Sequence, residues 1–105
     1  MDNTIAMKRL EIVISKDKFS KIASLFSRSD IRGYTIIKHA GGLGSRGPVE
    51  NGDVTLNDGN VVVILACQEK KAQKVLAEIQ PIMQELGGMC LVSDCLWLEK
   101  PKASY

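Results

Sequence analysis

One segment organises the whole chain: Gly33-Tyr34-Thr35-Ile36-Ile37-Lys38-His39-Ala40-Gly41-Gly42-Leu43-Gly44-Ser45-Arg46-Gly47. Its first residues, Tyr34 to Ile37, are aromatic or β-branched, which suits the pleated surface of a strand. The glycines that follow let the backbone adopt positive φ and approach a ligand closely. The segment therefore predicts a strand that runs directly into a glycine-rich loop.

The glycine-rich loop carries one arginine, Arg46. Successive backbone N–H groups in such a loop can form an anion-binding concavity, and the planar guanidinium fork suits phosphate or carboxylate. One interpretation is therefore an anion or nucleotide-phosphate site. The other is a surface loop that is rich in glycine only because it has to turn, and these residues alone leave both open.

The loop also matches the dinucleotide-binding fingerprint at Gly42-x-Gly44-x-x-Gly47. That fingerprint requires a helix that opens at the last glycine. Pro48-Val49-Glu50-Asn51-Gly52-Asp53 follows instead and keeps breaking any helical pattern. We therefore reject a Rossmann-type site.

The composition bounds the class of protein. The 105 residues suit a single domain over 1–105, with 45% hydrophobic and 25% charged residues, as in ordinary globular proteins. A net charge of +2 and five aromatic residues give no basis for nucleic-acid binding, which relies on positive charge and stacking. No apolar run approaches the roughly 18 residues of a membrane span, so direct membrane insertion is not expected.

The residues that most often carry catalysis or metals are few. Cys67, Cys90 and Cys95 have no C-x-x-C spacing and the lone histidine, His39, is distant in sequence, so no metal site is expected. Cys67 and Cys90 sit in apolar runs and should be buried thiols. An odd number of cysteines without a signal peptide suits a reducing cytoplasm. No catalytic arrangement can be assembled from spacing, so we expect a binding or signalling module and not an enzyme.

Hydrophobic periodicity predicts four strands and two helices. The strands are expected at 8–14, 34–39, 61–67 and 89–98, and the helices at 18–29 and 69–86. Residues 1–6 are expected to be frayed, 40–59 to form a long flexible loop, and 99–105 to form a polar tail.

The helix boundaries have their own signals. Ser15 and Asp17 are N-cap candidates for the first helix. Pro81 should kink the second helix because proline removes a hydrogen bond and clashes with the preceding turn. Gly87-Gly88 should end it.

The element order is βαββαβ, which predicts the ferredoxin-like α+β fold: an antiparallel four-stranded sheet with two helices on one face. The third strand, 61–67, is apolar at every position, so both of its faces should be covered. One layer of helices covers only one face. Another subunit is therefore expected to cover the other.

Over roughly its whole length the chain resembles the PII-like signalling proteins. The element order, the long loop after the second strand and Gly33-x-Thr35 at the loop entry carry this resemblance. Together, Gly33-Tyr34-Thr35 and Gly41-Gly42-Leu43-Gly44-Ser45-Arg46 are similar to one branch, the small PII-like regulators associated with bicarbonate transporters and carboxysomes.

The resemblance implies a homotrimer that binds an adenine nucleotide (AMP, ADP, ATP or cyclic AMP) between subunits, with bicarbonate as a further ligand. Loop 40–59 would be the family's T-loop, which changes shape with the ligand and contacts a protein such as a membrane transporter or a carboxysome-linked protein. This describes a cytoplasmic regulator of inorganic-carbon uptake or fixation that reaches the inner membrane through its partner. The implied nucleotide-binding residues are Gly33, Thr35, Gly41, Gly42, Gly44, Ser45, Arg46, Gly87, Gly88 and Met89.

The chain also departs from the family. Nitrogen-regulatory PII carries T-G-x-x-G-D-G-K after the second helix, whereas Met83–Leu91 has no lysine, which argues against tight triphosphate binding and 2-oxoglutarate sensing. The loop has no tyrosine for uridylylation. The alternatives are a nitrogen-regulatory PII-type protein, a trimeric ferredoxin-like structural module without a ligand, and a small ferredoxin-like enzyme or metal-binding protein.

Overall fold

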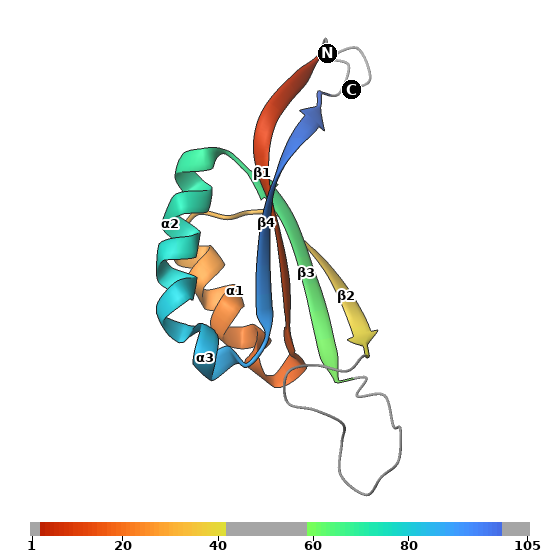
Figure 1. Ribbon diagram of the computed structural model, residues 1–105, viewed down its shortest axis with the longest axis vertical. Helices are drawn as coiled ribbons and strands as arrows, with labels where there is room; N and C mark the ends of the chain where they lie inside the picture. The colour runs from red at the N-terminus through yellow and green to blue at the C-terminus, as the bar shows by residue number, and fades with distance from the viewer. Residues whose placement is uncertain (1–2, 42–58, 100–105) are drawn as a thin grey trace, which may run out of the picture.

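The computed structural model describes residues 3–41 and 59–99, which form one antiparallel sheet with helices on a single face (Figure 1). The strand order is β2-β3-β1-β4 and each neighbouring pair is antiparallel. The elements are β1 Thr4–Ser15, η1 Lys16–Lys18, α1 Phe19–Arg28, β2 Thr35–Ala40, β3 Asn60–Cys67, α2 Glu69–Ile79, η2 Gln80–Ile82, α3 Met83–Leu86 and β4 Met89–Leu98. The ferredoxin-like α+β prediction is confirmed.

Strand β1 is longer than its sequence predicted. The expectation that residues 1–6 are frayed was wrong for 4–6, because Thr4 pairs with Leu98 and Ala6 with Leu96 of β4; residues 1–2 lie outside the described part. These residues lack a strong strand pattern of their own. Strand preference depends on the neighbouring strand, and here that neighbour lies at the far end of the sequence.

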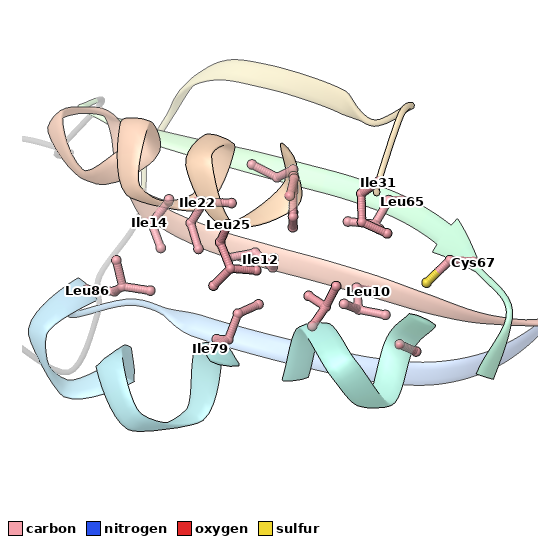
Figure 2. Packing of buried hydrophobic residues seen from close by; sticks show 14 of the residues in the cluster. Leu10, Ile12, Ile14, Ile22, Leu25, Ile31, Leu65, Cys67, Ile79 and Leu86 are labelled. Carbon is pink, nitrogen blue, oxygen red and sulfur yellow. The ribbon is translucent and has the colours of Figure 1, made fainter. Parts of the chain in front are cut away.

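The core lies between the sheet and the helices. Leu10, Ile12 and Ile14 of β1 are at most 1% exposed, which confirms their predicted shared face. Figure 2 shows Ile12 close to Leu25 of α1, with Ile79 of α2 on the other side of the same core. Complete burial of side chains of this size stabilises the fold by about 1.5–3 kcal/mol each.

Helix α1 begins without either predicted cap. A single 3-10 turn, Lys16–Lys18, precedes it, so that Lys18 occupies the N-cap of α1. Ser15 precedes this turn, and its Oγ donates to the Asp17 carboxylate instead of capping a backbone N–H. The N-cap prediction was therefore wrong for α1 itself: Ser15 takes the N-cap position of the preceding 3-10 turn without a side-chain cap bond, and Lys18 takes that of α1.

The end of α1 is fixed to α2. Asp30 adopts φ 58°, and the Ile31 N–H donates to the Phe26 carbonyl at 2.9 Å, the pattern of a Schellman end. Lys71 of α2 donates to the Asp30 carbonyl oxygen at 2.9 Å and also pairs with the Asp30 carboxylate at 3.5 Å. The turn that leads to Gly33 is thereby held against helix α2.

The second helical segment is broken at Pro81, as predicted. Helix α2 ends at Ile79, a 3-10 turn contains Pro81, and α3 resumes at Met83. Gly87 then ends α3 in the left-handed region, with φ 66° and its N–H donating to the Met83 carbonyl at 3.0 Å. The kink and the glycine terminator are both confirmed. No helix in the described parts of the chain is both long and apolar enough to cross a bilayer.

The opposite face of the sheet has no covering layer within residues 3–41 and 59–99 (Figure 1). Along β3, residues from Val61 to Cys67 alternate between buried positions under the helices and half-buried positions on this face. Ile37, Met89, Leu91 and Trp97 also expose 46–50% of their surface. Their registers place all four on this helix-free face. The face is thus apolar but open in one chain.

Candidate functional site

A groove of about 470 Å³ lies where β2 begins beside β3. The register between the two strands starts at the pair Thr35–Ile64, so β3 continues past the first residue of β2. This step in the sheet leaves space at its edge. The groove is lined by Arg9, Gly33, Tyr34, Thr35, Ile64, Leu65, Ala66 and Trp97.

Strand registers show that most of the lining belongs to the helix-free face. Arg9 is paired with Ala66, and Thr35 is paired with Ile64, two residues before Ala66. Paired residues point to the same face, and every second residue along a strand does so as well. Trp97 shares that face because it pairs with a β1 residue four positions before Arg9. All four strands therefore contribute residues to the lining of this groove.

The aromatic side of the groove is held in place by α1. The Tyr34 ring lies 5.2 Å from the Phe26 ring and 6.0 Å from the Phe19 ring, centroid to centroid, in tilted and edge-on arrangements. Such pairs contribute about 0.5–1.5 kcal/mol beyond simple burial. Phe26 is fully buried, while Tyr34 keeps 38% of its surface exposed toward solvent. Tyr34 thus joins the helical core to the groove.

Arg9 is the one charged residue among the eight that line the groove. Its Nη1 lies 3.4 Å from Oε2 of Glu11, on the same face two residues further along β1. Both side chains are partly exposed, so the pair itself contributes little stability. A guanidinium carries five N–H donors. One contact with Glu11 therefore leaves Arg9 able to bind an acceptor in the groove.

The predicted nucleotide-binding residues fall into two groups at opposite ends of the sheet. Gly33 and Thr35 line the groove. Gly41 follows the other end of β2, and Met89 pairs with Val13, four residues from Arg9 along β1, or about 13 Å at the rise of a strand. Gly87 and Gly88 directly precede Met89. The remaining four, Gly42, Gly44, Ser45 and Arg46, lie outside the described residues.

Two of these glycines are required by the fold itself. Gly87 has φ 66°, which is unfavourable for other residues. A Cβ on Gly88 would lie 1.8 Å from the Val13 carbonyl oxygen, so the chain passes β1 too closely for a side chain. Gly33, by contrast, has no atom within 4 Å of an added Cβ. The glycines at 87 and 88 thus have structural reasons to be there whether or not a ligand binds.

The sequence did not predict that Arg9 and Trp97 line the groove. Alternation along the first and fourth strands could have placed both on the face away from the core. It could not show that Arg9 pairs with Ala66 of β3 and that Trp97 pairs with Ile5 of β1, because both facts depend on register between distant strands.

The cysteines contribute no reactive group to the groove. Cys67 is buried and Cys90 half-buried, so burial was predicted correctly for the first and only partly for the second. Burial raises the pKa of both thiols, which disfavours the nucleophilic thiolate. Within the described residues, no cluster of three or more His, Cys, Asp or Glu side chains could hold a metal ion.

Comparison with known proteins identifies a matching family and several solved structures that resemble this one. Residues 7–100 match the family model described as Nitrogen regulatory protein P-II. The structure resembles CPII, a nitrogen regulatory PII-like protein from Thiomonas intermedia K12, bound to ADP, AMP and bicarbonate: 25% sequence identity, TM-score 0.75, covering 89% of this chain and 96% of that one. The structure of CPII bound to ADP and bicarbonate has 27% sequence identity to this chain and a TM-score of 0.74, with 89% of each chain covered.

A more distant structure shares the fold alone. A PII-like signalling protein from Thermus thermophilus has 18% sequence identity and a TM-score of 0.68, with 91% of this chain and 93% of that one covered. The search of curated proteins found no match.

Proposed function

The chain belongs to the nitrogen regulatory protein P-II family, and from that premise we propose that it is a signalling regulator that binds adenine nucleotides in clefts between subunits. CPII, its structural relative at 25–27% identity, binds ADP in both forms described above. The groove supplies an apolar floor at Ile64 and Ala66, and the hydroxyl of Thr35 lies beside it. That combination suits a flat base with polar edges.

The observation that carries the proposal is the separation of the two residue groups. Gly33 and Thr35 lie at one end of the sheet, and Gly41 and Met89 at the other. One ligand can contact both groups only if the far end of a second chain docks beside the groove of the first. The uncovered apolar face, with Leu91 50% exposed, gives such a docking a driving force. A closed homotrimer of the 11.5 kDa chain meets both requirements.

In this proposal the chain is one domain and residues 40–59 act as the T-loop. The phosphates of the nucleotide bind at the base of this loop, where Gly42, Gly44, Ser45 and Arg46 provide N–H groups and a charge. The loop then changes shape and controls a protein target without catalysis. CPII binds bicarbonate as well as ADP, which supports a target in inorganic-carbon uptake or fixation, reached in the cytoplasm or at the inner membrane.

Calorimetric titration with ADP, ATP, AMP, cyclic AMP and adenosine tests the proposal, with light scattering for the assembly. A charged hydrogen bond to phosphate contributes about 1.5–3 kcal/mol, so Arg46→Ala should weaken ADP binding about ten- to a hundredfold. Adenosine should lose much less affinity. Arg28→Ala, which removes the same charge from the exposed side of α1, is the matched control and should bind ADP as wild type does.

Three results would contradict the proposal. A protein that stays monomeric at micromolar concentration could not form a site between subunits. A trimer that binds none of the five ligands at millimolar concentration would be a structural module. Equal ADP affinity in wild type and Arg46→Ala would remove Arg46 from the nucleotide site and leave partner contact as its role.

A further inference from the structure

Trp97 reaches the groove from a part of the sheet that the helices do not cover. It pairs with Ile5, whereas β3 ends at Cys67, opposite Lys8. Beyond that point β1 and β4 continue as a two-stranded arm (Figure 1). Two strands alone bury little surface. Trp97 keeps 46% of its surface exposed and still lines the groove.

The packing of the helix-side core does not explain the position of Trp97, which is one of the exposed apolar residues on the face proposed to dock a neighbouring subunit. The described core consists of side chains on the helix side of the sheet, and Trp97 lies on the opposite face. An aromatic ring combines a large apolar surface with a specific stacking geometry. Base–aromatic stacking contributes about 1–3 kcal/mol per base and depends little on which base is stacked. The groove thus contains an exposed stacking surface beside its apolar floor.

Arg9 complements this surface with hydrogen-bond donors. It pairs with Ala66 in the groove floor and has only N–H groups to offer. Thr35, across β3 on the same face, carries a hydroxyl that can accept as well as donate. An adenine edge presents both ring-nitrogen acceptors and an N6–H₂ donor. Arg9 and Thr35 therefore match the two kinds of polar atom on such an edge.

We propose that Trp97 is the stacking wall for the nucleobase and that Arg9 donates to the ring nitrogens at the base edge. The inference rests on the proposed function, and it identifies the groove as the base-binding half of the site. The phosphates then lie toward the neighbouring chain. Neither residue belongs to the glycine-containing motifs that carry the resemblance to the family.

The chain provides its own reporter because Trp97 is its only tryptophan. ADP and adenosine should change the fluorescence of Trp97, with midpoints that equal the calorimetric dissociation constants. Ribose 5-phosphate, which lacks the base, should leave the fluorescence unchanged. The reverse pattern, a response to ribose 5-phosphate but not to adenosine, would overturn the assignment of the base to this half.

Variants test the two contacts separately. Trp97→Leu should weaken both ADP and adenosine binding about five- to a hundredfold, and Trp97→Phe should restore most of the affinity if the leucine variant folds poorly. Leu98→Ala is the matched control because Leu98 is 71% exposed and alternates to the other face of β4. It should bind ADP normally.

Arg9→Ala should weaken the binding of ADP and of adenosine by the same factor, because the proposed contact is to the base. A loss confined to ADP would place Arg9 on the phosphates and overturn its role. Suppose that calorimetry detects ADP binding to wild type, but ADP does not change the fluorescence of Trp97 and Trp97→Leu binds ADP as tightly as wild type does. The inference is then wrong and the proposed function stands. If calorimetry detects no ADP in wild type, the proposed function itself fails.

Discussion

Replacing Gly88 with alanine should destabilise the fold strongly, whatever Gly88 does for a ligand. An added Cβ would lie 1.8 Å from the carbonyl oxygen of Val13, 2.9 Å from its carbonyl carbon and 3.0 Å from Cγ2 of Ile14. Carbon atoms make their best contacts at about 3.5–4.0 Å. The segment at Gly88 or strand β1 would therefore have to move by more than about 1 Å.

A shift of strand β1 would cost substantial free energy of folding. It lies between β3 and β4, and Val13 is paired with Val62 on one side and Met89 on the other. Overpacking costs about 1–3 kcal/mol and occasionally more. Because the colliding atom belongs to a backbone that is paired on both sides, we expect about 3 kcal/mol. About 4–8 °C of melting temperature per kcal/mol is typical for a domain of this size, so the expected drop is about 12–24 °C.

Thermal unfolding followed by circular dichroism, at one protein concentration and without nucleotide, measures this drop. Gly33→Ala is the matched control: an added Cβ there meets nothing within 4 Å, so the change should stay within about 0.5 kcal/mol. Gly87→Ala should fall between the two, since φ 66° costs other residues about 1–2 kcal/mol. Gly88→Ala with a wild-type melting temperature would show that Gly88 does not pack against β1 in this way.

The hydrogen bond and charge of Arg32, aided by Lys71, hold the pKa of the Asp30 carboxyl below its ordinary value of 3.8. The ionised Asp30 carboxyl therefore stabilises the fold at pH values above 3.8, and this contribution is lost as the pH falls through the lower, folded pKa. Asp30→Asn should melt slightly below wild type at neutral pH, and the difference in melting temperature should close as the pH is lowered below 3.8. A difference that widens in acid would contradict this. His39 has φ 59° at the register shift between Ile37 and Ala40. Because glycine tolerates this conformation and β-branched residues do not, His39→Gly should melt above His39→Val, and the opposite order would refute the strain at this position.

Local patterns in the sequence were sufficient for the elements and the core. Leu10, Ile12 and Ile14 alternate as a half-buried strand must, and Pro81 breaks its helix because proline acts within one turn. The N-cap of α1 was misplaced because a three-residue 3-10 turn, which leaves no clear periodicity, separates Ser15 from the helix. Properties that depend on distant neighbours were not predictable: the pairing of residues 4–6 with β4, and the meeting of Arg9 with Trp97, both follow from strand register.

Three glycines that look alike in the sequence differ physically, and the difference limits what each can say about ligand binding. A side chain at Gly88 would collide with the β1 backbone, and Gly87 has a dihedral angle that other residues rarely adopt. A loss of nucleotide binding after substitution at either position would therefore first reflect damage to the fold. Gly33 has open space around it and lies in the groove. Its lack of a side chain leaves room beside Thr35 without any structural need for that room. Of the three, Gly33 is the position where a substitution that lowers affinity without lowering stability would identify contact with the ligand.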